Sequence, residues 1–263
     1  MVAASKMRRA QDASKATTPY TQSAREILAH LAGLGATKQH VLFQERPVKK
    51  RLLIVIASDR GLKGAYNANV AKAYLRELMS DDKAGIETST IAVGRKVTQF
   101  VTRLKDAKVV GVYEELPDKL EGTEMRGVLD SAYNLFVDGE VDAVDVVYTQ
   151  FISSISQVPK IERLLPAGKA ASVEDQLANE VEFEPDVETV LEQVTYRLVG
   201  AQLFQALLDG RASEYSMQMI AMKNATDNAT DLIDDLTLEM NKARQAAITQ
   251  ELAEISGGAE AMK

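Results

Sequence analysis

The last third of the chain has the pattern of one very long helix. Neither proline nor glycine interrupts the sequence between Met217 and Gly257. A domain of ordinary size cannot bury a helix of this length, so the helix must pair with another helix or be covered by other proteins. The sequence therefore predicts that the function of this chain lies in an assembly.

Small and apolar residues recur along this segment three and four positions apart, with one irregular step. This is the spacing of a coiled-coil seam, and its alanines allow two helix backbones to approach closely. The predicted seam consists of Met222, Ala225, Ala229, Leu232, Leu236, Met240, Ala243 and Ala247.

The start of the chain shows the same alternation, at Ala3, Met7, Ala10, Ser14, Thr17, Thr21, Ala24, Leu28 and Leu31. We therefore expect an antiparallel coiled coil of the two terminal helices, with a globular domain inserted in the connection. Pro19 removes one backbone donor from the first helix. Because the periodicity resumes beyond it, we expect a kink near Thr17 and Thr18 rather than a helix end.

The composition of the chain argues against several classes of function. The net charge of -7 argues against general nucleic-acid binding, and the absence of cysteine excludes disulfides and thiolate metal sites. No apolar run reaches the length that crosses a bilayer, and the first residues lack the apolar core of a signal peptide. We expect a soluble, cytoplasmic chain without direct bilayer insertion.

Charge is unevenly placed along the chain. The first helix is basic, with Lys6, Arg8, Arg9, Lys15 and Arg25. A later stretch is acidic and has no basic residue among Glu174, Asp175, Glu180, Glu182, Glu184, Asp186, Glu188 and Glu192. Such runs are usually solvated faces, and the sharper interpretation is that the basic helix meets an acidic partner.

The region between the helices alternates strands and helices. The run from Arg51 to Ser58 is continuous, apolar and β-branched, which is typical of a central parallel strand buried on both faces. Further strands are predicted at 88–93, 109–113, 143–151 and 158–165, and helices at 68–80, after Gly94, and at 124–137. This alternation predicts βαβ units and a Rossmann-like α/β domain. The predicted division is an N-terminal coiled-coil helix (1–47), the α/β domain (48–166), an acidic irregular return segment (167–185) and the C-terminal coiled-coil helix (186–263).

The loop Asp59-Arg-Gly-Leu-Lys-Gly64 follows the first strand, where α/β folds often hold phosphate. It matches neither the dinucleotide fingerprint nor the P-loop, so we interpret it as a structural turn in which Asp59 or Asn67 caps a helix. His30 and His40 have no obvious carboxylate pair and are interpreted as surface or interface residues. The sequence predicts no catalytic residue, no cofactor site and no metal site.

Several segments closely resemble the gamma subunit of F-type ATP synthases, the central rotor shaft, and the resemblance covers essentially the whole chain. The most specific of them are Met1 to Gln11, Ser58 to Gly64, Phe151 to Pro159, Ala221 to Asn228 and Met240 to Leu252. The family pattern has further residues before Met1, so the resemblance implies a chain that begins partway along the first helix, through a late start assignment, a fragment or a natural truncation. Two other departures are Gln218, where the family often has arginine, and Lys63, where some members have cysteine or alanine.

The resemblance implies a non-catalytic subunit that transmits torque between the membrane c-ring and the catalytic beta subunits. The implied partners are three alpha and three beta subunits around one copy of this chain, the epsilon subunit and the c-ring, on the cytoplasmic face of the cell membrane. Gln245, Thr249 and Glu251 occupy positions that contact beta-subunit loops in the family. Tyr196, Phe204 and Arg211, within the stretch from 196 to 211, are expected near the c-ring or epsilon.

Two readings from other classes remain open at this stage. One is a small-molecule or nucleotide-binding α/β enzyme whose terminal helices serve only for dimerisation. It would need a phosphate-cradling loop, which the sequence lacks. The other is a coiled-coil adaptor, which would self-associate through its exposed helix. Whether the coupling ion is a proton or sodium, and whether the complex acts as synthase or hydrolase, does not follow from the sequence.

Overall fold

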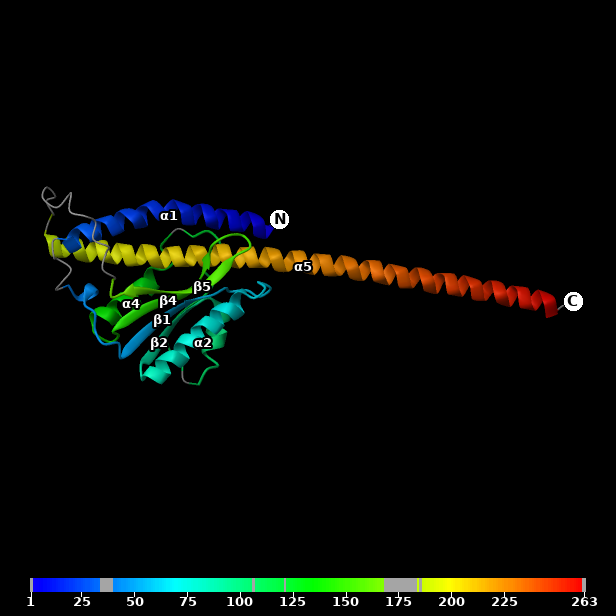
Figure 1. Cartoon of the computed structure of the whole chain (residues 1–263), viewed down its shortest axis with the longest axis horizontal. Helices are drawn as coiled ribbons and strands as arrows, with labels where there is room; N and C mark the ends of the chain where they lie inside the picture. Colours follow the sequence, from blue (N-terminus) through cyan, green and yellow to red (C-terminus); the bar gives the residue numbers. More distant parts are fainter. Residues whose placement is uncertain are drawn as a thin grey trace. The chain divides into compact units, whose positions relative to one another are not determined.

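A computed structural model of the chain describes residues 2–33, 40–105, 107–120, 122–167, 184 and 186–261. The chain divides after Gln218 into two parts, Met1–Gln218 and Met219–Lys263, each of which is described by itself. The first contains the sheet and most of the helices (Figure 1). The second is helical through Ala261.

A five-stranded sheet forms the centre of the first part, in the order β3-β2-β1-β4-β5. Its strands are β1 (Lys50–Ile56), β2 (Glu87–Val93), β3 (Lys108–Tyr113), β4 (Ala143–Phe151) and β5 (Gln157–Leu165). The first four strands pair with one another in the parallel sense, whereas β5 pairs with β4 in the antiparallel sense. The predicted central position of β1 is confirmed, and every residue of β1 after Lys50 is buried. That burial explains why its sequence is apolar throughout rather than alternating.

Helices cover both faces of this sheet. On one face, α2 (Tyr66–Ala84) and α3 (Arg95–Val101) pack through Val70, Tyr74, Val97 and Val101. On the other face, α4 (Arg126–Val137) and the first part of α5 (Val187–Ala261) share one core with β1, β2 and β4. This layering confirms the predicted α/β class. The domain boundaries at 47, 166 and 185 stay a prediction.

Helix α1 (Val2–Gly33) lies against the first part of α5 and continues through Pro19, as predicted (Figure 1). Its seam residues Ala24, Leu28 and Leu31 are buried in one cluster with Leu191 and Leu198. Nearer its start, Ser14 bonds to Asp209. Because residue numbers rise along α1 as they fall along α5, the two helices are antiparallel, which confirms the predicted arrangement of the terminal helices.

The stretch of α5 that receives α1 differs from the predicted one. The contacts described for α1 involve α5 residues that precede Gln218, from Leu191 to Tyr215. The predicted seam residues of 222–247 are exposed, Leu236 at 55%. Helical periodicity identified a seam in each helix, but it could not show which seams meet, because the register depends on where the sheet holds α5.

Gly94 connects β2 to α3 at a point of close backbone approach. Its φ is +101°, and a Cβ at this position would lie 2.3 Å from the Ala57 carbonyl oxygen. Its own N–H donates to the Tyr113 carbonyl at 2.7 Å, so three strand ends meet here. Glycine is required both by the φ value and by the space.

Gly94→Ala should therefore lower the free energy of unfolding by about 2 to 3 kcal/mol, through backbone strain and a clash with another backbone. Gly85→Ala is the matched control, because Gly85 also has a positive φ of +71° but has nothing within 4 Å of the added Cβ. The control should cost about 1 kcal/mol. Urea unfolding followed by circular dichroism measures both, and equal losses would contradict this account of Gly94.

Candidate functional site

The second part of the chain presents apolar side chains to solvent. We call residues 219–261 of α5 the exposed helix. Leu232, Met240 and Leu252 are each about 60% exposed, at 59%, 59% and 61%. The same holds for most large apolar residues along this segment, namely Ile233, Leu236, Leu238, Ile248 and Ile255. Apolar exposure over this length is characteristic of a surface that another protein covers, so the exposed helix is the principal candidate site.

The three residues expected to contact a beta subunit lie on this exposed helix. Thr249 and Gln245 are one turn apart on one face, and the Thr249 hydroxyl donates to the Gln245 carbonyl at 2.8 Å. Glu251 follows two residues later. Since successive helical residues are separated by about 100°, Glu251 points to the other side of the helix. One partner loop cannot meet all three side chains from one direction.

The loop after β1 is attached to α5 rather than open to a ligand. The Lys63 ammonium lies 2.9 Å from Glu214 Oε1 and donates to Gln218 Oε1 at 2.7 Å. Lys63 and Glu214 are both buried. A buried lysine already paired in this way is not available to a phosphate, so the prediction of a structural turn is supported. Lys63 and Gln218 contact each other, a pairing that the sequence pattern did not reveal because 155 positions separate them.

Of the two residues predicted to cap a helix, Asp59 and Asn67, Asp59 does so at the start of α3. Its Oδ1 accepts from the backbone N–H of Arg95, the first residue of α3, and from that of Glu115, each at 3.0 Å. Asn67 does not cap α2. It lies within that helix, and its Oδ1 accepts from the Ser58 backbone N–H at 3.1 Å.

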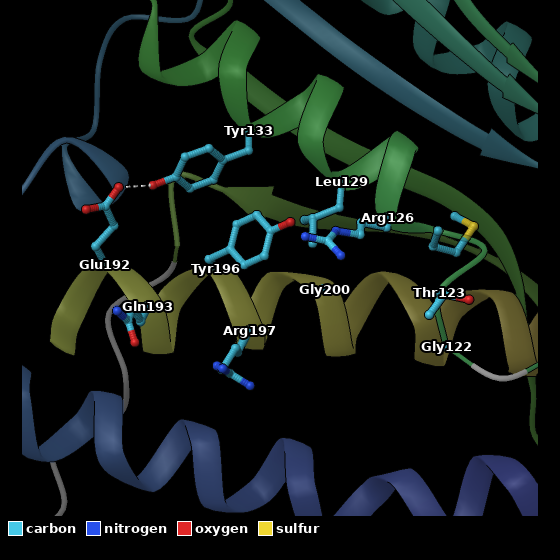
Figure 2. Close-up of a pocket in the computed structure, with 11 residues that line it drawn as sticks. Gly122, Thr123, Arg126, Leu129, Tyr133, Glu192, Gln193, Tyr196, Arg197 and Gly200 are labelled. Carbon is cyan, nitrogen blue, oxygen red and sulfur yellow. Dashed lines mark hydrogen bonds between the residues drawn. The ribbon is translucent and has the colours of Figure 1, made fainter. Parts of the chain in front are cut away.

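A pocket of about 640 Å³ lies between α4 and the start of α5 (Figure 2). Two tyrosines form its wall: the rings of Tyr133 and Tyr196 lie edge to face, 5.3 Å apart. The Tyr133 hydroxyl donates to Glu192 at 2.8 Å, and Tyr196 donates to Asp130. Burial raises the pKa of Tyr133 above its ordinary value, and Glu192 adds to the shift. Arg126 and Arg197, two positively charged residues, also line the pocket.

The three residues expected near the c-ring or epsilon all lie on the side of α5 that meets the α/β domain. Tyr196 lines the pocket beside α4, and Phe204 packs against the main core. Arg211 donates to the Leu116 carbonyl at 3.1 Å and forms an ion pair with Glu214 at 3.2 Å. The structure therefore distributes them along one face of α5 rather than gathering them into one exposed patch.

Polar contacts join α1 to α5 nearer the start of α1 than the cluster of Ala24, Leu28 and Leu31. The Ser14 hydroxyl donates to Asp209 Oδ1 at 3.1 Å, and Thr17 donates to Gln205 Oε1 at 2.5 Å. Lys6 forms an ion pair with Asp118 at 2.6 Å, which lowers the pKa of that carboxyl. The other basic residues with described side chains, Arg8, Arg9 and Lys15, are exposed on α1; the side chain of Arg25 lies outside the described residues.

The histidines and the acidic stretch were the remaining candidates, and those of them that the structure describes make local contacts. His40 is the N-cap of a short helix, Val41–Phe43, and its Nδ1 accepts from the Leu42 N–H. The side chain of His30 and the acidic residues from Glu174 to Glu182 lie outside the described residues. Asp186 accepts from the Thr189 N–H at 2.8 Å at the start of α5. Within the described ranges, no three acidic or histidine side chains are placed to hold a metal ion. None of the described helices has the length and apolarity of a membrane-spanning segment.

Comparison with known proteins gives consistent matches over the whole chain. A family model described as ATP synthase matches residues 1–262. The ATP synthase gamma chain of Cupriavidus pinatubonensis is 42% identical over 267 residues, which cover 100% of this chain and 91% of that protein. The ATP synthase gamma chain of Stenotrophomonas maltophilia is 41% identical over 266 residues, with the same coverage.

Solved structures share the fold. A chain of the Euglena gracilis mitochondrial ATP synthase in rotational state 3 has a TM-score of 0.63 at 20% identity, covering 98% of this chain and 95% of that one. A chain of the Tetrahymena thermophila mitochondrial ATP synthase central stalk and c-ring has a TM-score of 0.59 at 21% identity, covering 86% and 100%. At this identity, the likeness establishes the fold alone.

Asp209 gives the α1–α5 contact a predicted pH dependence. Burial raises the pKa of this carboxyl, although Ser14 and Gln205 donate to it. Its charged form therefore destabilises the folded state at neutral pH, and Asp209→Asn should increase the free energy of unfolding at pH 7. That advantage should shrink as the pH falls through the folded-state pKa, because the folded wild-type carboxyl then takes up a proton while the unfolded one is still ionised, which removes the cost of burying the charge.

Urea unfolding of both proteins across this pH range measures the difference. Asp142→Asn is the opposite control, because backbone N–H donors hold the pKa of Asp142 below its ordinary value. That variant should be less stable than wild type at pH 7. A gain for Asp209→Asn that grows on acidification would contradict the assignment.

Proposed function

This chain belongs to the ATP synthase gamma chain family, and from that membership we propose that it is the central-stalk rotor subunit of an F-type ATP synthase. It transmits torque between a membrane c-ring and the catalytic beta subunits during ATP synthesis or hydrolysis. Relatives that are gamma chains by name, and solved central-stalk and rotor chains with the same fold, support this proposal.

The exposed helix is the observation that carries the proposal. Its apolar residues cannot be covered by a small ligand, because they are spread along the helix from Leu232 to Ile255. A ring of three alpha and three beta subunits around one copy of this chain would cover them on all sides. The opposite directions of Thr249 and Glu251 suit such a ring, since loops of different beta subunits could meet them.

ATP chemistry in this proposal takes place on the beta subunits, and this chain is non-catalytic. The buried Lys63 and the absence of a phosphate-binding fingerprint support a shaft without a nucleotide site. The shaft needs only to interact unequally with the three catalytic sites. Each orientation then stabilises a different set of site conformations, and this difference in free energy is sufficient for coupling.

The other partners are the c-ring and the epsilon subunit, which place the chain peripherally on the cytoplasmic face of the cell membrane. The pocket beside Tyr196 and the neighbourhood of Phe204 and Arg211 remain proposed as the region near these partners. The exposed basic residues Arg8, Arg9 and Lys15 of α1 suit acidic loops on the surrounding subunits.

Co-expression with the cognate alpha and beta subunits tests the proposal. We expect a purified hexamer that carries one copy of this chain and hydrolyses ATP, as shown by sizing, stoichiometry and turnover. Self-association of this chain without a hexamer would favour an adaptor. Failure to associate with either subunit would overturn the proposal.

The proposed beta contact at Thr249 can be tested against a matched residue. Thr249→Ala should reduce ATP hydrolysis by the assembled complex by a factor of about three to ten, because a partner contact is lost. Thr102→Ala is the control: Thr102 is exposed at the end of α3, outside the exposed helix, and its hydroxyl donates to the Thr98 carbonyl at 2.8 Å, as that of Thr249 does to Gln245. Both variants should leave the stability of the isolated chain within about 0.5 kcal/mol of wild type, so equal turnover in the two complexes would count against the contact.

A further inference from the structure

The attachment of α5 to the α/β domain changes character along the helix. From Leu191 to Leu208 it is largely apolar, and Leu203 and Leu207 are buried in the core beneath the sheet. From Arg211 to Gln218 it is polar. Three side chains in this stretch bond to loops that follow the strands: Arg211 to the Leu116 carbonyl, Tyr215 to Asp118 and Ser216 to the Ser154 carbonyl. A fourth, Ser213, donates to the Thr149 carbonyl within β4.

We call residues 211–218 of α5, with the loop residues bonded to them, the polar collar. Its members come from the loops after β1, β3 and β4, and Gln157 of β5 adds a bond to the Ser216 hydroxyl at 3.1 Å. Ser213 and Ser216 are fully buried, and Glu214 is 3% exposed. The collar therefore holds α5 from several directions, immediately before the exposed helix begins at Met219.

Four charged groups lie at the centre of the collar. Lys63 contacts Glu214 and Gln218, and its ammonium also lies 5.1 Å from the centre of the Tyr215 ring. Arg211 pairs with Glu214 at 3.2 Å and lies 3.8 Å from Asp59 Oδ2. The other oxygen of Asp59 accepts from the backbones of Arg95 and Glu115. A single carboxylate thus links the loops after β1, β2 and β3 to the helix.

These two modes of attachment resist different movements. Apolar burial holds α5 against the sheet, but it is non-directional and depends mainly on the area covered. Ion pairs and hydrogen bonds depend on distance and angle, so they oppose rotation of the helix about its axis and movement along it. Buried ion pairs are weak evidence for stability, because desolvation offsets their attraction, and fixing one arrangement is a better-supported use for them.

We propose that the polar collar is the joint that locks α5 to the α/β domain against rotation and axial displacement, with Lys63 as its central positioning residue. This inference rests on the proposed rotor function, since only a shaft that carries torque needs such a joint. Lys63 has this role because it is the cation that the β1 loop contributes to the helix. The collar passes torque from the α/β domain into the exposed helix.

Lys63→Met tests the joint, since it removes the charge and keeps the apolar stem. The variant is assembled into the complete ATP synthase complex, which is reconstituted into lipid vesicles. ATP hydrolysis and the membrane potential it generates are measured together with a voltage-sensitive dye, which responds to either coupling ion. We expect the potential per ATP hydrolysed to fall roughly fivefold, with one copy of the chain still present per complex. Lys83→Met removes a charge from an exposed site on α2 and should match wild type.

A second variant separates the joint from a general effect on folding. The chain contains no cysteine, so Lys63→Cys/Gln218→Cys can be bridged with a short bismaleimide, with Lys63→Cys alone as the control for the reagent. Bridging should restore the potential per ATP in the double variant and leave the single variant impaired. If Lys63→Met prevents assembly, the comparison of the double variant with and without the bridge tests the joint by itself.

Two results would overturn the inference: coupling in Lys63→Met equal to that of Lys83→Met, or impaired coupling that persists after complete bridging. Neither would affect the proposed function, because both presuppose a complex that contains one copy of this chain. The proposed function fails by a different result, the absence of any complex with the wild-type chain.

Discussion

The packing of the first part of α5 on the parallel sheet is the interaction on which the rest of this structure depends. Leu203, Ala206 and Leu207 are buried against the same core as β1, β2 and β4. Once α5 is fixed there, its outer side becomes the surface on which Leu28 and Leu31 of α1 are buried. The helix is thus apolar on two sides within this stretch. The register of the terminal helices follows from the sheet rather than from the helices themselves.

Buried charged residues of this fold are grouped at junctions between elements, where the distance and angle of each contact matter more than the apolar area that is buried. Arg51 is buried among Asp145, Asp81 and Glu77 at the edge where β1 meets β4 and α2. Lys63, Arg211 and Glu214 are grouped in the polar collar. Burying such groups costs desolvation free energy, which apolar residues of similar volume would avoid. In both places, the charges fix the geometry of a junction between elements whose apolar cores already hold them together.

The exposed helix poses the opposite problem, because its large apolar side chains are exposed in the part of the chain that the structure describes. Apolar exposure of this extent marks a surface that a partner covers. Binding a partner to it would stabilise the folded helix by mass action. The contrast along α5, from an apolar attachment through a polar collar to an exposed surface, fits a subunit that is held firmly at one stretch and interacts with changing partners at another.

The sequence by itself determined the periodic features of this protein. A continuous apolar run located β1, the alternation of strands and helices predicted the parallel sheet, and the small-residue seam of α1 was identified correctly through Pro19. The long helix without glycine or proline already indicated an assembly. These features are local, since each follows from residues a few positions apart.

Only the tertiary structure decided which distant residues meet. The stretch of α5 that receives α1, the capping of α3 by Asp59 and the contact between Lys63 and Gln218 all join segments that are not neighbours in the chain. Spacing within a segment contains no information about such pairs. They are set by the strand order of the sheet and by the register at which α5 packs on it, because every side chain on a packed helix has its neighbours assigned once that register is fixed.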